Sequence, residues 1–253
     1  MPKLIFLGTS NAIPDETHEN THMAVVGENH FLLIDCVNNP IVRMKQAGLN
    51  IHELTDLLLT HFHPDHVSGV PSLLMNSWLL GRSTPLHIYG LEYTLERIER
   101  MMEFYEWQSW PGFFPVSFHD VPEEELAWVL ENKDFRVFAS PVHHIVPAIG
   151  LRVEFPAIGQ DLAYSCDTEP CQEVIRLGRD ANVLIHEATG DSFGHSSASQ
   201  AGEVASQAGA EILYLIHYPT GDFDPYPLVE EARTTFSGPV YLAEDFMELE
   251  FRA

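Results

Sequence analysis

The hexapeptide His61-Phe62-His63-Pro64-Asp65-His66 carries four potential metal ligands within six positions. It follows directly on an apolar run at residues 56–60, which predicts a buried strand. A strand end that opens into a loop can direct neighbouring side chains into one pocket, and imidazole and carboxylate groups are ligands for zinc and its first-row neighbours. The chain has 14 histidines, so a chance cluster is the alternative. We favour a metal site, because four donors in this order after a strand are a specific pattern.

Short apolar runs alternate with amphipathic stretches on both sides of this hexapeptide, a pattern typical of layered α/β structure. Predicted strands cover residues 3–7, 23–26, 31–35, 56–60, 86–89, 116–120, 135–141, 150–155, 162–165, 183–185, 212–216, 240–243 and 247–251. Predicted helices cover residues 40–47, 70–80, 92–106, 170–177, 197–208 and 227–236. Each half of the chain therefore supplies a sheet with helices outside it. Two such halves packed face to face predict a four-layer αββα sandwich, with residues 1–253 forming a single domain.

Composition limits the classes of partner. The 253 residues include 13 Lys and Arg against 37 Asp and Glu, a formal charge of −24, which repels nucleic acid at long range. The three cysteines, Cys36, Cys166 and Cys171, argue against a disulfide framework and for a reducing compartment. No apolar run is long enough for a signal sequence or a membrane span. We therefore expect a cytoplasmic protein with no membrane partner.

The metal motif resembles the His-x-His-x-Asp-His signature of the metallo-β-lactamase superfamily, and the resemblance extends along nearly the whole chain, most closely to ribonuclease Z and its relatives. The further matching segments are Gly-Thr-Ser-Asn-Ala-Ile-Pro at 8–14, residues 81–90, Ala-Tyr-Ser-Cys-Asp-Thr at 163–168, His-Glu-Ala-Thr at 186–189, and residues 194–201 with their Gly-His-Ser start. Cys166 stands where the family has glycine. The resemblance implies the metallo-β-lactamase αββα fold and a hydrolase that works through a hydroxide bridging two metal ions.

The resemblance also implies the residues that hold these ions. Matching the motifs gives the ligand set His61, His63, Asp65, His66, His144, Asp167 and His217, in which Asp167 bridges the two metals. For the ligand after residue 141 both His143 and His144 are available, and His144 is preferred because Gly150 then has the family spacing. Histidine and carboxylate ligands of this kind are most typical of zinc, and they also bind manganese or iron.

Three residues are candidates for catalysis rather than for binding alone. Asp65 can orient the nucleophile or accept its proton. His195, in a loop rich in Gly and Ser, can donate a proton to the leaving group while Glu187 holds its tautomer. The alternative is that His195 caps the following helix and that Glu187 makes a structural hydrogen bond.

The sequence restricts the type of reaction more narrowly than it restricts the substrate. Ribonuclease Z carries a long tRNA-binding arm between the third histidine and the bridging aspartate, whereas here only residues 145–166 occupy that interval, and two strands and a turn use them up. Together with the charge, this disfavours tRNA, although a tRNA 3′-processing endoribonuclease stays an alternative. We favour a phosphodiesterase acting on a small or nucleotide-like diester. The same motifs are compatible with a hydrolase of carboxylic or sulfuric esters, lactones or thioesters, and with a non-catalytic metal- and ligand-binding protein.

An aromatic stretch at residues 104–118 has two interpretations. It could form a wall over an apolar substrate or stack bases, or it could pack into the core or a dimer interface, which is the commoner use of aromatic residues. The resemblance also allows a homodimer.

Overall fold

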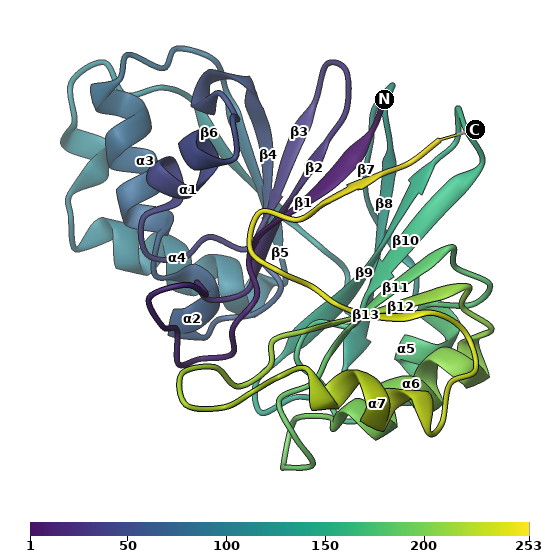
Figure 1. Ribbon diagram of the computed structural model, residues 1–253. Helices are drawn as coiled ribbons and strands as arrows, with labels where there is room; N and C mark the ends of the chain where they lie inside the picture. The colour runs from purple at the N-terminus through teal and green to yellow at the C-terminus, as the bar shows by residue number, and fades with distance from the viewer. Residues whose placement is uncertain (253) are drawn as a thin grey trace.

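The computed structural model describes residues 1–252 and contains two seven-stranded sheets that pack face to face, each covered on its outer side by helices (Figure 1). These layers are the predicted αββα sandwich. Side chains from both sheets meet between them, and Phe6, Leu32, Leu151 and Leu162 are completely buried there. Each such side chain contributes about 1.5–3 kcal/mol through the surface it removes from water.

The first sheet and its helices come mainly from the first half of the chain. In spatial order the strands are β14 (Glu248–Glu250), β1 (Lys3–Gly8), β2 (His22–Val26), β3 (Phe31–Ile34), β4 (Leu54–Leu58), β5 (Leu86–Gly90) and β6 (Val116–Asp120). The helices are α1 (Pro40–Gln46), α2 (Pro64–Val67), α3 (Val70–Leu79) and α4 (Glu92–Glu103), with 3-10 turns η1 (Ile51–Glu53) and η2 (Trp107–Ser109). In α4 the buried residues Leu95, Ile98 and Met102 recur every three or four positions, so one stripe faces the sheet.

The second sheet is built from the second half of the chain. In spatial order its strands are β13 (Val240–Leu242), β12 (Ile212–Ile216), β11 (Val183–Glu187), β10 (Gln160–Tyr164), β9 (Ala148–Phe155), β8 (Arg136–Val142) and β7 (Ala127–Glu131). Its outer helices are α5 (Gln172–Leu177), α6 (Ala198–Ala208) and α7 (Pro227–Arg233). A capping box in which Ser197 and Gln200 exchange hydrogen bonds fixes the start of α6.

Two strands differ from the sequence prediction. The last strand, β14, was expected in the second sheet, but it returns to the first and pairs antiparallel with β1, with Lys3 opposite Glu250 (Figure 1). This pairing covers an edge of β1 whose backbone groups would otherwise lack partners. The other strand, β7, was not predicted, because its alternation is short and three acidic residues, 123–125, precede it.

The aromatic segment 104–118 does not form a wall over the predicted metal site, so that interpretation is wrong. The segment leads into the amino end of β6, whereas His61 follows the carboxyl end of β4, and β4, β5 and β6 are parallel. The two features therefore lie at opposite ends of the sheet. Trp110 stacks on Trp78 at the end of α3, with ring centroids 5.1 Å apart. Most of the segment packs beside the helical core, and the predicted homodimer stays a prediction.

Among residues 1–252, no helix combines the length and the apolar character that crossing a bilayer requires.

A close contact between α6 and α7 offers a test of how tightly this layer is packed. A Cβ atom at Gly202 would lie 2.4 Å from the carbonyl oxygen of Ala232 and 2.4 Å from Oγ1 of Thr235. We expect Gly202→Ala to lower the free energy of unfolding by about 1–3 kcal/mol, because neither helix can move without losing other contacts. Chemical denaturation measures this, with Gly178→Ala as control, since its Cβ would come no closer than 3.3 Å to another atom. Equal effects of the two changes would show that α7 adjusts freely.

Candidate metal centre

The seven predicted ligands converge at one rim of the sandwich, where several strands end. His61 and His63 follow β4, and Asp65 and His66 lie on the short helix α2 that begins at Pro64. The others lie in loops on the second sheet: His144 after β8, Asp167 after β10 and His217 directly after β12. An isolated bridge between His61 and Ala148 joins the two sheets at this point.

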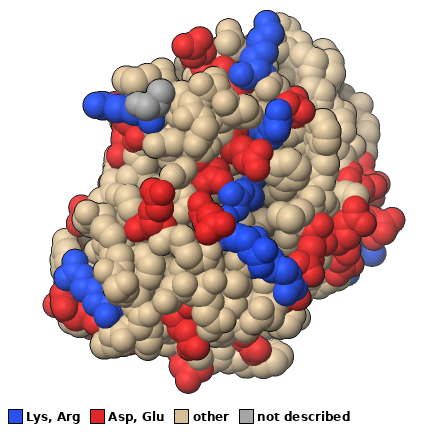
Figure 2. Space-filling model, turned by 90° about the vertical axis from the view of Figure 1, so that its right-hand side faces the viewer, with Lys and Arg blue, Asp and Glu red and all other residues tan. Residues whose placement is uncertain are grey.

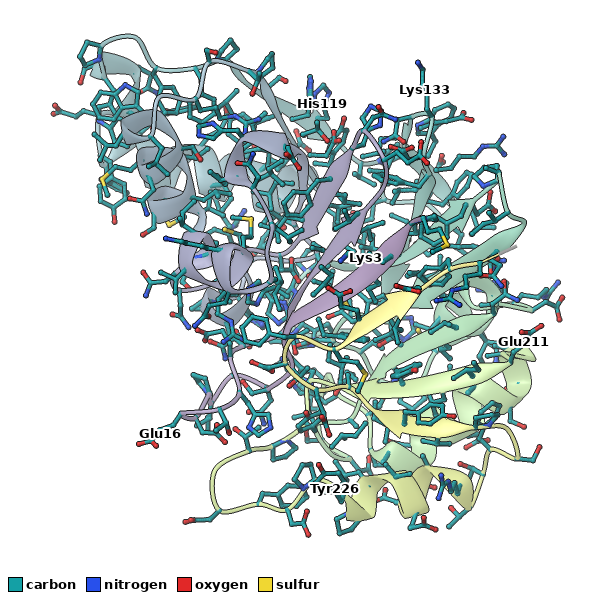
Figure 3. The ribbon with its side chains drawn as sticks, turned by 45° about the horizontal axis from the view of Figure 1, so that its top comes forward. Lys3, Glu16, His119, Lys133, Glu211 and Tyr226 are labelled. Carbon is teal, nitrogen blue, oxygen red and sulfur yellow. The ribbon has the colours of Figure 1, made fainter. Side chains whose placement is uncertain are left out.

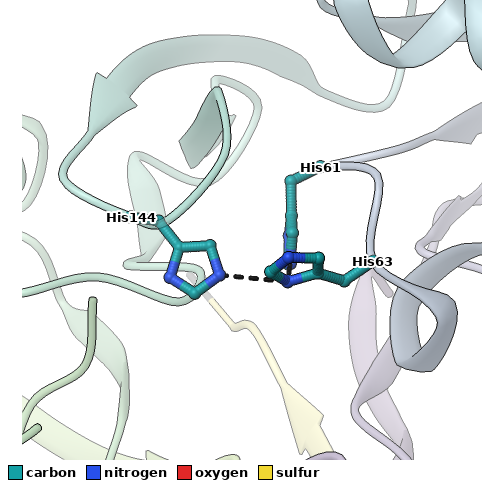
Figure 4. A group of neighbouring side chains, drawn as sticks. All are labelled: His61, His63 and His144. Carbon is teal, nitrogen blue, oxygen red and sulfur yellow. Dashed lines mark hydrogen bonds between the residues drawn. The ribbon is translucent and has the colours of Figure 1, made fainter. Parts of the chain in front are cut away.

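Three of these residues form one donor group. The Nε2 atoms of His61 and His144 each lie 3.1 Å from Nδ1 of His63, so the three rings face a common point (Figure 4). Burial chiefly lowers the pKa of all three imidazoles. Neutral imidazole is the form that binds a metal ion.

Asp65, His66, Asp167 and His217 form the second donor group, with all four ligand atoms within 4.8 Å of one another. The carboxylate of Asp167 is its centre: Oδ2 lies 3.4 Å from Nε2 of His217, 3.5 Å from that of His66 and 4.0 Å from that of His61. Asp167 thus faces both groups, as a bridging ligand must.

Several of the donor atoms lack hydrogen-bond partners, as expected if they bind cations. Nε2 of His66, Nε2 of His217 and Oδ1 of Asp167 are buried and have no hydrogen-bond partner among the described residues. Such unpaired buried polar atoms are rare in native proteins and point to an unseen partner. Imidazole nitrogens and carboxylate oxygens are the donor set for zinc, manganese or iron.

A second layer of hydrogen bonds orients the imidazoles, and the sequence analysis missed it. Nδ1 of His66 lies 2.8 Å from the carboxylate of Asp35, and Nδ1 of His217 lies 2.8 Å from Oγ1 of Thr189. Nδ1 of His144 lies 2.7 Å from the carbonyl oxygen of Gly194. In each case the second ring nitrogen, Nε2, is left for the cluster. The available signal for Asp35 was an acidic residue at the end of an apolar strand run.

Replacing Asp35 tests this orienting role. Asp35 is completely buried, and its carboxylate contacts both His66 and Thr60. We expect Asp35→Asn to weaken metal binding by about 10–100-fold, because an amide holds the ring of His66 less firmly. Competition with a chromophoric chelator measures the affinity. An unchanged affinity in a folded variant would mean that packing alone orients His66.

His195 and Glu187 lie next to the two donor groups: ligand atoms of His195 are within 4.8 Å of those of His144 and Asp167, and also of those of Glu187 and His217. Nδ1 of His195 lies 2.9 Å from Oε1 of Glu187, and Glu187 is completely buried. The backbone N–H groups of Thr168, Thr189 and Ser196 also donate to this carboxylate. Burial alone would lower the pKa of His195, but the hydrogen bond and charge of Glu187 outweigh it and raise that pKa. Ser197, not His195, caps α6, so the capping alternative for His195 is wrong.

The interval between His144 and Asp167 contains no arm. β9 and β10 form a hairpin, with Phe155 opposite Gln160, and residues 156–159 make its turn. His143, the alternative to His144, turns away from the cluster: its Nε2 lies 3.5 Å from Oε2 of Glu173.

Known proteins share this fold and, in part, this sequence. Residues 30–218 match the family model of the beta-lactamase superfamily domain. Ribonuclease Z of Methanothermobacter thermautotrophicus is 30% identical over 309 aligned positions, covering 100% of this chain and 98% of the relative. The structure of the metallo-beta-lactamase fold protein YhfI from Bacillus subtilis superposes with a TM-score of 0.84 at 20% identity, covering 98% of both chains. That of the short form of human tRNase Z superposes with a TM-score of 0.79 at 26% identity, again covering 98% of each.

Both the family match and the ribonuclease Z relative extend over most of the sequence, and the donor groups at the rim are those of a metal site. The chain therefore belongs to the beta-lactamase superfamily and is a metal-dependent hydrolase related to ribonuclease Z.

Proposed function

We propose that the protein is a binuclear phosphodiesterase acting on a small or nucleotide-like diester. The observation that carries this proposal is the position of Asp167 between two groups of donors, each large enough to hold one ion. His61, His63 and His144 would hold the first ion and Asp65, His66 and His217 the second, with Asp167 shared. Zinc suits these donors best, and manganese or iron are alternatives. Two such ions, when bound, supply a water nucleophile at neutral pH and neutralise charge that develops on a phosphoryl group.

The residues around the ions have distinct roles in this proposal. Asp65 is partly exposed and its Oδ2 lies 3.5 Å from Nε2 of His217, so it can orient the attacking water and accept its proton. Glu187 fixes the Nδ1–H tautomer of His195 through the 2.9 Å hydrogen bond. Because Glu187 also raises the pKa of His195, Nε2 can take up a second proton, and the Nε2–H of this imidazolium can then protonate the leaving oxygen.

Substrate size follows from the cavity beside His144. It has a volume of about 430 Å³ and is lined by Ile145, Pro147 and Phe193, among others. Phe193 is 78% exposed and Ile145 54%, so both offer apolar surface to a ligand. A volume in this range accommodates one drug-sized or nucleotide-sized molecule.

The charge around the rim disfavours a long polyanion. The segments that surround the donors, residues 8–21, 61–69, 143–150, 165–175 and 187–224, contain no Lys or Arg. Glu16, in the first of these segments, lies at the same end of the molecule as Tyr226, whereas Lys133 lies at the opposite end beside His119 (Figure 3). Without Lys or Arg in these segments, little counterion release would offset repulsion of an RNA backbone.

One further face of the molecule likewise carries no basic track that could take the place of an arm. Figure 2 shows one face on which Lys and Arg lie among Asp and Glu rather than in a continuous basic track. Several arginines are already paired, including Arg176 with Glu125 at 2.6 Å. The alignment with ribonuclease Z also has 309 positions, 56 more than the 253 residues of this chain, so the relative carries segments that are missing here.

Two other functions stay alternatives, and only the first has support from the comparisons. The full-length match to proteins named ribonuclease Z favours tRNA 3′ processing. The ions would also serve a carboxylic ester, lactone or thioester.

A substrate panel separates these functions. Metal-free protein is reconstituted with zinc or manganese and assayed with bis-p-nitrophenyl phosphate, p-nitrophenyl acetate, a lactone and a precursor tRNA. We expect the phosphate diester to be hydrolysed at least about tenfold faster than the carboxylic substrates, and activity to disappear on chelation. Precursor tRNA cleaved as fast as the small diester would favour the ribonuclease. No turnover at full metal loading would favour a non-catalytic binding protein.

A further inference from the structure

A second cavity lies between the start of α5 and the side of α6. It has a volume of about 380 Å³, and His143, Cys171 and Glu173 line one wall. Gln200, Glu203 and Gln207 of α6 form the facing wall. None of these residues belongs to the donor groups of the candidate metal centre.

The first wall brings together three different ligand atoms. A nitrogen of His143, Sγ of Cys171 and a carboxylate oxygen of Glu173 all lie within 4.8 Å of one another. Nε2 of His143 and Oε2 of Glu173 are 3.5 Å apart. The other oxygen of Glu173 accepts a hydrogen bond from Arg176, which leaves Oε2 directed towards His143. Donors around a tetrahedral zinc ion lie about 3.2–3.8 Å apart, so shifts of roughly 1 Å or less would complete this arrangement.

The burial of the three side chains suits a site that is anchored inside and open outside. Cys171 is only 7% exposed, whereas the side chain of His143 is 62% exposed and that of Glu173 24%. The thiol thus forms the floor, and the histidine and glutamate form the mouth. A fourth position faces the cavity, where a water molecule can complete a tetrahedron.

We propose that His143, Cys171 and Glu173 form an additional metal site that binds one zinc ion or another thiophilic divalent cation. A sulfur, a nitrogen and an oxygen donor together match zinc, and the thiolate distinguishes this site from the His and Asp donors of the main centre. The simpler interpretation is a His143–Glu173 ion pair beside a packed thiol. That pair does not account for the mostly buried thiol, whose Sγ lies within 4.8 Å of a ligand atom of both partners and 3.7 Å from Oγ1 of Thr168.

An ion at this site would connect two segments next to the main centre. His143 precedes His144, and its carbonyl oxygen accepts a hydrogen bond of 2.8 Å from the N–H of Glu169. Its own N–H donates to Oγ1 of Thr168 at 3.1 Å. Fixing the side chain of His143 to α5 therefore restrains the loop that carries His144.

Cobalt substitution tests the proposal directly. Metal-free protein is titrated with Co²⁺, and the near-ultraviolet absorption is followed for sulfur-to-cobalt charge transfer, which His and Asp ligands do not give. We expect this band in the wild type and in Cys36→Ala, and its loss in Cys171→Ser. Elemental analysis after zinc loading should give one ion fewer per chain in Cys171→Ser than in the wild type. The absence of the band in the wild type, or its persistence in Cys171→Ser, would overturn the proposal.

Two conservative variants keep the test decisive if Cys171→Ser does not fold. We expect His143→Gln and Glu173→Gln to keep a thiolate band but to weaken Co²⁺ binding at this site by about 10-fold or more, because each removes one of three ligands. Affinities equal to that of the wild type in both variants would also overturn the proposal. The result is independent of the substrate panel, because the charge-transfer band reports a thiolate ligand whether or not any ester is hydrolysed.

Discussion

Asp167→Asn is expected to lower phosphodiesterase activity by at least about 10³-fold and to remove at least one metal ion per chain. Oδ2 of Asp167 lies within 4.0 Å of nitrogens from His61, His66 and His217. His61 belongs to the first donor group, and the other two histidines belong to the second. A neutral amide has the size of the carboxylate but cannot offer a charged oxygen to two cations. Because Asp167 is only 1% exposed, bulk solvent does little to offset the loss of its negative charge.

Metal content and activity measured together give the test, with elemental analysis after gel filtration and initial rates on bis-p-nitrophenyl phosphate. Asp222→Asn is the matched control, since Asp222 is an exposed acidic residue in the loop after β12. We expect it to retain both metal and activity. If Asp167→Asn kept its full metal content and more than about a tenth of its activity, Asp167 would not be a bridging ligand.

His195→Gln is expected to lower kcat by about 10²–10⁴-fold while leaving the metal content unchanged. Its Nδ1 is held by Glu187, and its ring stacks beside that of His217 with centroids 5.9 Å apart. A glutamine can keep a hydrogen bond to Glu187 but cannot deliver a proton. Replacing Glu187 with glutamine should give a smaller loss, because the histidine stays in place without its charged partner.

The leaving group distinguishes catalysis from a structural role. A p-nitrophenolate departs without protonation, whereas the alkoxide released from a dinucleotide needs a proton. The loss in His195→Gln should therefore be larger for the dinucleotide than for bis-p-nitrophenyl phosphate. His18→Gln, which changes a histidine of the same rim that contacts Asp15, should leave both rates unaltered. Equal losses on the two substrates would assign His195 a positioning role.

Periodicity and composition were sufficient to predict most of the elements. The alternation of apolar runs indicated the two sheets and the helices outside them, and the αββα layering is confirmed. The two differences, one misplaced strand and one missed strand, involve a partner that is distant in sequence and a pattern that is weak. β14 pairs with β1 almost 250 residues away, and no local pattern distinguishes one sheet edge from another. Edge strand β7 is brief and irregular, with a register shift between Trp128 and Leu130.

The candidate ligands could be named because their motifs resemble those of the metallo-β-lactamase superfamily. Each of them also lies after a predicted strand, so the shared rim follows from the layering. Their supporting residues could not be named in this way. Asp35, Thr189 and the carbonyl of Gly194 contact ligands 31, 28 and 50 positions away. A hydrogen bond between such distant residues depends on how two loops meet, which periodicity does not encode.

By itself, the sequence determined the cluster of donors at His61–His66 and the strand before it, since both are local properties of residue type and pattern, and its resemblance to a known family supplied the other ligands. Only the tertiary structure decided that Asp167 lies between the two donor groups, that the aromatic segment packs at the opposite end, and that His143 faces Cys171 and Glu173. Such contacts form when the sheets pack, because the distance between side chains far apart in the chain is fixed only by the folded core.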